Sequence, residues 1–181
     1  GTIDDGAGRW AEHMWNGSDI YHPKQLGHEA MASAFPLTMW EALQAGKPLP
    51  EYIPTQGDEN GVACLSFVPE GQVQSYTLSY VSADTTYTEV YSAAQKKLWL
   101  YANGQQVSVT EGIDKTVGTI TIQGSNIHQV FFYRAAMTER EVRALARGKM
   151  LRSSLEIYCP LLGGNTTNYA QTMNCVAIHN K

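Results

Sequence analysis

The sequence of 181 residues lacks long apolar runs and basic clusters. No apolar run approaches the roughly 18 residues of a membrane-spanning helix, and the first residues lack the charged and apolar regions of a signal peptide. No run of lysine and arginine exceeds two residues, and the net charge is −4. This composition argues against a nucleic-acid groove or a surface for anionic membranes, so we expect neither partner.

Cysteine is also scarce and follows no metal-binding pattern. Cys64, Cys159 and Cys175 show no Cys-x-x-Cys spacing and no nearby histidine pair, so we expect no zinc site. No dense pattern of aspartate and asparagine predicts calcium, and nothing indicates another cofactor. Cys159 and Cys175 can pair across the last strands, or the cysteines can be small core residues. The sequence leaves both readings open.

What the chain does contain is enough apolar material for one core. Hydrophobic residues make up 43% of the sequence, and the length predicts one domain, or one domain with a small appendage. The composition changes at residues 46–61, where prolines and glycines surround acidic residues as in a surface connector. We expect a helical segment and linker over residues 1–50 and a separate domain over residues 51–181.

The larger part shows the period-two alternation of half-buried strands. Polar and apolar residues alternate at 75–80 and 119–122, and leucines alternate with aromatic residues at 98–101. Asn103-Gly104, between two apolar runs, is a strong hairpin signal. The spacing predicts roughly seven to nine strands between residues 62 and 133, which close as an antiparallel β-sandwich in a mainly β protein. Further turns are predicted at Gly112, Gly118 and Gly124.

One helix with well-marked ends interrupts the strand pattern. Thr138 and Glu141 have the spacing of a capping box. Gly148 suits the position after the last helical residue. We therefore expect one capped helix near 139–147, followed by a returning strand at 154–159.

A histidine lies at the predicted start of an N-terminal helix. Asp19 and His22 are three positions apart, and an acidic residue at this spacing can orient an imidazole that serves as a general base. Pro23 suits the first helical position, and a second short helix is expected at residues 36–46. The alternative reading of His22 is an ordinary turn histidine.

The run from Asp19 to Pro23 resembles the last motif block of SGNH (GDSL-type) hydrolases, an Asp-x-x-His followed by proline and a closing helix. With nearby tryptophans it is similar to the end of the sialate O-acetylesterases, including prophage-encoded ones. The resemblance implies that His22 is the catalytic base and Asp19 its partner. Because the 18 preceding residues are too few for a strand-helix-strand unit of about 30, we expect residues 1–50 to be the end of an esterase domain, inactive in this chain alone.

A second resemblance covers roughly residues 62–160. The run at 128–148 resembles the closing segment of laminin-G-like, concanavalin-type lectin modules, in which an aromatic-arginine pair ends a late strand before a short capped helix. The run at 98–106 is similar to the hairpin of the same superfamily. This resemblance implies a jelly-roll, concanavalin-like sandwich and leaves the ligand undefined.

Candidate carbohydrate-binding residues come from the predicted strands. Sugars are recognised by aromatic faces surrounded by polar side chains. Trp99 and Tyr101 alternate with leucines, and Tyr87 and Tyr91 share a strand face. If the leucines face the core, Trp99 and Tyr101 line a groove or face out. The alternative places the aromatic rings in the core.

Arg134 and Asp84 complete the candidate site. Arginine can hold the carboxylate of a sialic acid with two parallel hydrogen bonds. In the lectin-like pattern, however, this arginine usually ties the end of the strand to a neighbouring carboxylate, so both roles stay open. Asp84 begins a loop cluster that suits the glycerol side chain of a sialic acid.

These features predict a non-catalytic module that recognises sialic acid on sialylated glycans or mucin. By tethering, it would target an attached sialate O-acetylesterase, the missing N-terminal domain of the same polypeptide. The resemblance implies action outside the cell on host glycans. Two alternatives remain: an incomplete SGNH hydrolase whose His22 is completed by another chain, and a structural oligomerisation module.

Overall fold

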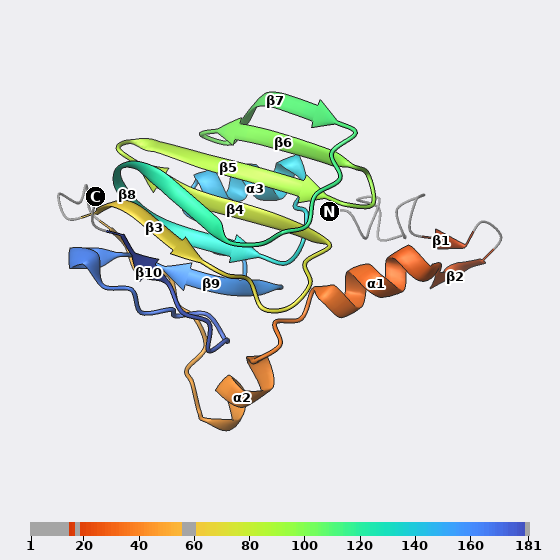
Figure 1. Cartoon of the computed structure of the whole chain (residues 1–181), viewed down its shortest axis with the longest axis horizontal. Coiled ribbons are helices and arrows are strands. Elements are labelled where there is room, and N and C mark those ends of the chain that lie inside the picture. The colour runs from red at the N-terminus through yellow and green to blue at the C-terminus, as the bar shows by residue number, and fades with distance from the viewer. Residues whose placement is uncertain (1–14, 17–18, 56–60, 180–181) are drawn as a thin grey trace.

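The computed structural model describes residues 15–16, 19–55 and 61–179 (Figure 1). No helix in these ranges is long and apolar enough to cross a membrane. In chain order the elements are β1 (Trp15–Asn16), β2 (Asp19–Pro23), α1 (Gln25–Ser33), α2 (Met39–Gln44), β3 (Val62–Phe67), β4 (Ser75–Ser82), β5 (Thr85–Ser92), β6 (Lys97–Ala102), β7 (Gln105–Glu111), β8 (Ile120–Tyr133), α3 (Glu139–Ala146), β9 (Leu155–Cys159), the 3₁₀ turn η1 (Leu162–Gly164) and β10 (Ala177–Ile178).

The main sheet is antiparallel and has the strand order β10-β3-β8-β4-β5-β6-β7, with β9 also paired to β8. The long strand β8 joins two parts of this sheet. Its first half pairs with β3, and its second half pairs with β4 and β9. Asn126 and Gln129 have φ values of 53° and 51° inside β8, and such residues interrupt a regular strand.

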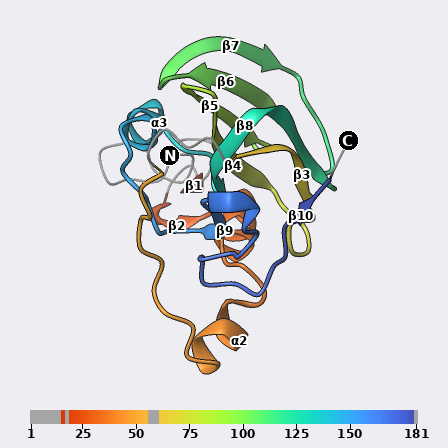
Figure 2. The ribbon, with the colours of Figure 1, turned by 90° about the vertical axis from the view of Figure 1, so that its left-hand side faces the viewer.

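The sheet folds back over itself, as one ring contact proves. Phe67 pairs with Ile120 at one end of β8, whereas Phe132 lies near the other end. Twelve residues of straight strand would separate these positions by about 40 Å. The Phe67 and Phe132 rings nevertheless lie 5.3 Å apart between centroids. The curled arm of β3, β8 and β10 therefore closes over β4 and β5, as the turned view suggests (Figure 2).

Two hydrophobic cores result, one on each face of the sheet. The first lies inside the fold and includes Leu65, Tyr76 and Phe132. The second lies on the opposite face, where Val142 and Leu145 of α3 pack against it, and α3 lies behind β4 and β5 in Figure 1. The predicted fold class, a mainly antiparallel β-sandwich with short N-terminal helices and one later helix, is confirmed.

The predicted helix and hairpin are present as expected. The hydroxyl of Thr138 accepts a hydrogen bond from Glu141 N at 3.3 Å, and the Glu141 carboxylate accepts one from Thr138 N at 2.7 Å. Asn103 and Gly104 both have positive φ, 50° and 78°, as a two-residue type I′ hairpin requires. A Cβ on Gly104 would lie 3.1 Å from that of Ala146, so the hairpin packs closely on the end of α3.

The predicted strand number was too high. Six strands, β3 to β8, lie between residues 62 and 133, because β8 continues through the expected turn at Gly124. A Cβ on Gly124 would lie 2.7 Å from Ser82 Oγ. This glycine therefore serves a close approach between β8 and the end of β4, and not a turn.

The N-terminal segment differs from expectation at its start. Residues 19–23 form strand β2, and the first residue of α1 is Gln25, with Lys24 as its N-cap. Pro23 is therefore not the first helical residue, although it still precedes a helix. The second helix begins at Met39, three residues later than predicted, and Gly46 follows it with a φ of 71°. The boundary near residue 50 stays a prediction.

Candidate functional site

The pairing of β4, β5 and β6 sorts the predicted aromatic residues onto two faces. Tyr91 pairs with Leu98, and Val90 pairs with Trp99. Because neighbouring residues in a strand point to opposite faces, Tyr87 and Tyr91 share the face of Leu98. Trp99 and Tyr101 lie on the other face, so the four rings do not form one site.

The face that carries Trp99 and Tyr101 is covered by α3. Tyr101 is 5% exposed and belongs to the second core, and Trp99 is half-buried against the same core. Burial raises the pKa of the Tyr101 hydroxyl. For these two residues the arrangement matches the core alternative of the sequence analysis, in which the rings pack inside.

The other face is partly open and presents Tyr87. This ring is 42% exposed and stacks on Tyr80, with a centroid distance of 5.6 Å and an interplanar angle of 29°. Tyr91, on the same strand face, is 1% exposed and belongs to the first core. We call the open surface of Tyr80, Tyr87, Glu89 and Lys115 the Tyr87 face.

A lysine from the loop after β7 completes the Tyr87 face. Lys115 Nζ lies 3.3 Å from Oε1 of Glu89, and it lies 4.9 Å and 5.2 Å from the ring centroids of Tyr76 and Tyr91. The Tyr76 hydroxyl donates to Glu89 Oε1 and accepts from Lys115 Nζ. Burial is the main cause that raises the pKa of Tyr76, and the nearby Glu89 carboxylate raises it further. The Tyr76 hydroxyl therefore stays protonated and can donate a hydrogen bond.

This network gives Glu89 a fixed position with a free acceptor. Among the described residues, the contacts of its carboxylate go to Oε1, which leaves Oε2 for a hydroxyl donor. The Glu89 and Lys115 side chains are about one-third exposed. Lys115 could not be predicted as a site residue, because no local motif brings residue 115 back over β5.

Asp84 is exposed in the two-residue turn between β4 and β5. It precedes Tyr87 by three residues, at the end of the strand that carries the Tyr87 face. Its position is compatible with the predicted role as a loop contact beside an aromatic platform.

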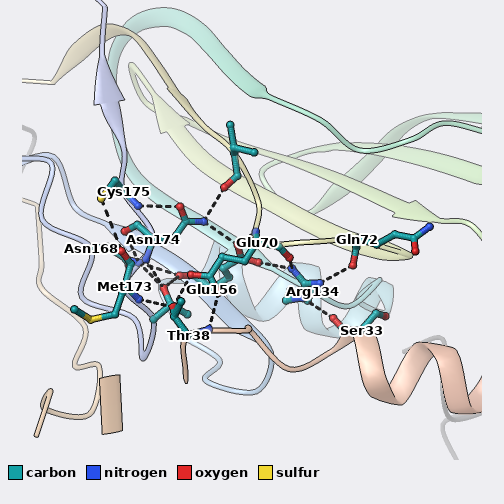
Figure 3. A network of polar contacts seen from close by, with 12 residues as sticks. Ser33, Thr38, Glu70, Gln72, Arg134, Glu156, Asn168, Met173, Asn174 and Cys175 are labelled. Atoms are coloured by element: carbon teal, nitrogen blue, oxygen red, sulfur yellow. Dashed lines mark hydrogen bonds and ion pairs between the residues drawn. The ribbon is translucent and has the colours of Figure 1, made fainter. Parts of the chain in front are cut away.

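Arg134 lies away from the surface in a buried polar network (Figure 3). It is 3% exposed, and its Nη1 lies 2.8 Å from Glu156 Oε2 and 2.7 Å from Glu70 O. Its Nη2 donates to Gln72 O, and its Nε donates to Ser33 O. All three nitrogens are thus used, and the arrangement corresponds to the structural role that the sequence left open, with Glu156 as the neighbouring carboxylate. Burial raises the pKa of Glu156, and Arg134 opposes this shift.

The same network holds the N-terminal helices against the sandwich. Ser33 is the last residue of α1, so Arg134 satisfies a carbonyl at the end of that helix. The Glu70 carboxylate accepts from the backbone N and the hydroxyl of Thr38, the residue that precedes α2. Neither helix has its own side-chain cap at the N-terminus, so part of their end stabilisation comes from the sandwich.

The predicted esterase remnant is only partly described. His22 is exposed in β2, and the side chain of Asp19 lies outside the described residues. Their catalytic roles stay predictions. Ser66 Oγ and Nε2 of His179 are within hydrogen-bond distance, a pair that no sequence motif indicates. This pair is exposed and by itself lacks the oxyanion donors that an esterase needs.

The cysteines are free thiols, with Cys64 and Cys159 buried and Cys175 exposed. The pairing of Cys159 with Cys175 is therefore not observed, and two of the three are core residues as the alternative expected. Burial raises the pKa of Cys159 to about 12, which makes this thiol unreactive at neutral pH. Among the described residues, no group of three or more metal-ligating side chains occurs.

Comparisons with known proteins add little to this geometry. The chain matches no protein-family model and no curated protein, so nothing there supports the esterase resemblance. Among solved structures, it is similar to a native heptameric SAP-like pentraxin from Limulus polyphemus. The identity is 14% and the TM-score 0.35, and the match covers 53% of this chain and 80% of that chain. This likeness assigns no ligand to the Tyr87 face.

Proposed function

We propose that the chain is a carbohydrate-binding module that holds a sugar against the Tyr87 face. The observation that carries the proposal is the exposed ring of Tyr87, which Tyr80 supports from the side and Glu89 borders. Aromatic rings pack on the apolar patches of sugar rings, and convergent polar groups fix the hydroxyls. Because Tyr80 and the strand already order Tyr87, binding costs little additional side-chain entropy.

The ligand that we propose is sialic acid on glycoconjugates. Lys115 provides a cation for the sugar carboxylate, the role that the sequence had offered to Arg134. Glu89 Oε2 provides an acceptor for a hydroxyl or an N-acetyl N–H, and Asp84 provides a further acceptor at the end of the strand. The choice of sialic acid over other acidic sugars comes from the resemblance of residues 1–50 to sialate O-acetylesterases.

The second part of the proposal is that the module targets an attached esterase domain. Residues of α1, of α2 and of the segment between them expose large apolar side chains, among them Phe35 of that segment at 58% and Trp40 of α2 at 70%. Exposed apolar patches of this kind mark interaction surfaces. Since Arg134 and Glu70 fix both helices on the sandwich, the patch has a defined orientation toward a neighbouring domain.

A calorimetric titration of the intact chain with the methyl α-glycoside of N-acetylneuraminic acid tests whether the chain binds sialic acid. We expect saturable binding that weakens at least about tenfold in Tyr87→Ala, since a central aromatic contact is worth about 1.4 kcal/mol or more. Tyr52→Ala is the matched control, because Tyr52 is similarly exposed and lies in the connector at residues 46–61. A flat titration with this and other sialosides would remove the proposal.

Light scattering over a range of protein concentrations tests whether the apolar patch mediates self-association. We expect a monomer, because the proposed role of the patch is to contact the attached domain and not a second copy of the chain. A dimer that Trp40→Ala dissolves, together with no sugar binding, would favour the structural oligomerisation module instead.

A further inference from the structure

We infer that the Tyr87 face continues into a second saccharide subsite, so that the module binds an oligosaccharide laid along β5. This inference rests on the proposed function and adds a ligand length to it. The second subsite is a cleft of about 450 Å³ at the far end of β5. It lies between the loop before β4 and the loop between β7 and β8, and its lining includes Gln72, Gln74, Tyr91, Asp114, Lys115 and Thr116.

Lys115 makes the two regions continuous. The Lys115 ammonium contacts Glu89 on the Tyr87 face, and the same residue lines the cleft. Tyr87 and Tyr91 are four residues apart on one strand face, which corresponds to about 13 Å. This length exceeds a single sugar ring and accommodates linked units, with Glu89 midway between them.

The outer wall of the cleft, formed by the loop of Lys115, is tied to the sheet. The Tyr91 hydroxyl lies 3.3 Å from Lys115 N and 3.4 Å from Lys115 O, accepting from the first and donating to the second. Ile113 and Val117 of the same loop pack against the first core. A preformed wall reduces the ordering cost of binding.

The side chains of the cleft suit a hydroxyl-rich unit. Gln74 and Thr116 offer amide and hydroxyl groups, which can donate and accept. The lining also includes apolar atoms of Val73 and Val117. Mixed polar and apolar walls of this kind match the two kinds of surface on a pyranose ring.

Titration with a ligand series separates this inference from the proposed function. The probes are the methyl α-glycoside of N-acetylneuraminic acid, and 3′-sialyllactose as a trisaccharide that begins with the same sugar. We expect the trisaccharide to bind about tenfold tighter, which is ~1.4 kcal/mol. Equal affinities would overturn the second subsite and leave the first intact, whereas no binding of either probe would remove the proposed function.

Substitutions then locate the added affinity. Gln74→Ala and Thr116→Ala should reduce the advantage of the trisaccharide severalfold, and Gln44→Ala on α2 is the control because its exposed amide lies outside the cleft. Tyr87→Ala should weaken both probes. If both cleft variants keep the full advantage of the trisaccharide, the extra sugar units bind elsewhere and the inference is wrong.

Discussion

The two faces of the β4–β5–β6 region carry similar aromatic residues, but these residues have different surroundings. On one face, Tyr101 and Trp99 pack beneath α3 in the second core. On the other, Tyr87 is open beside a charged pair. The difference lies in what covers each face, since both sets of rings come from neighbouring strands in the same sheet. An aromatic residue in a strand is thus a candidate contact only after the covering elements are known.

This comparison predicts that substitutions on the covered or buried side change stability, and that substitutions on the open face change sugar binding. A residue that changes the opposite property would break the comparison.

The largest effect is expected for Arg134→Ala. It should lower the free energy of unfolding by about 3–5 kcal/mol, because Glu156 would lose its cation in a buried site. Urea unfolding measures this loss. Arg147→Ala, an exposed arginine next to α3, should change stability by less than about 0.5 kcal/mol.

The stability loss of Arg134→Ala should also depend on pH. The pKa of Glu156 is already raised by burial, and removal of Arg134 should raise it further. The folded state would then bind a proton that the unfolded state, with a pKa of about 4.3, releases. The loss relative to the unmodified protein should therefore be smaller near pH 4 than near pH 7. A loss that grows on acidification would contradict this role.

Tyr101→Ala should cost about 3 kcal/mol of stability, since it removes a large ring from the core beneath α3. Tyr87→Ala should cost less than about 1 kcal/mol because its ring is partly in solvent already. Thermal or urea unfolding of the two variants side by side checks the difference. Equal losses would show that the two faces are equally buried.

Thr138→Ala should lower stability by about 1 kcal/mol, because it removes the capping box at the start of α3. The affinity for the sialoside should stay unchanged, because α3 covers the face opposite Tyr87. Unfolding and titration of the same preparation test both statements. A large loss of sugar affinity would place the ligand on the α3 side.

The smallest effect is expected for Asp84→Ala. Its side chain is exposed in the β4–β5 turn, so one hydrogen bond to the ligand is worth about 0.5 kcal/mol, or roughly a twofold change in affinity. Stability should not change measurably. A tenfold loss of affinity would move the centre of the site from Tyr87 to the turn.

Much of the fold could be predicted because its signals are local. The capping box at Thr138, the hairpin at Asn103-Gly104 and the alternation in β4 each depend on a few adjacent residues. The long course of β8 was missed because Gly124 reads as a turn in the sequence, whereas its role is a close approach to Ser82, 42 positions away.

The candidate site was harder to predict for the same reason. Which face α3 covers, and whether Arg134 meets Glu156 or a ligand, depend on contacts between distant segments. Lys115 reaches Glu89 only because the loop after β7 returns over β5. Period-two patterns place residues on faces but do not say which face is open.

The most direct test of the account is the affinity for the methyl α-sialoside of two variants measured together, Tyr87→Ala and Trp99→Ala. We expect Tyr87→Ala to lose at least about tenfold in affinity, and Trp99→Ala to bind as the unmodified chain does once it is shown to be folded. Unchanged binding by Tyr87→Ala, or a loss confined to Trp99→Ala, would contradict the assignment of the sugar to the open face.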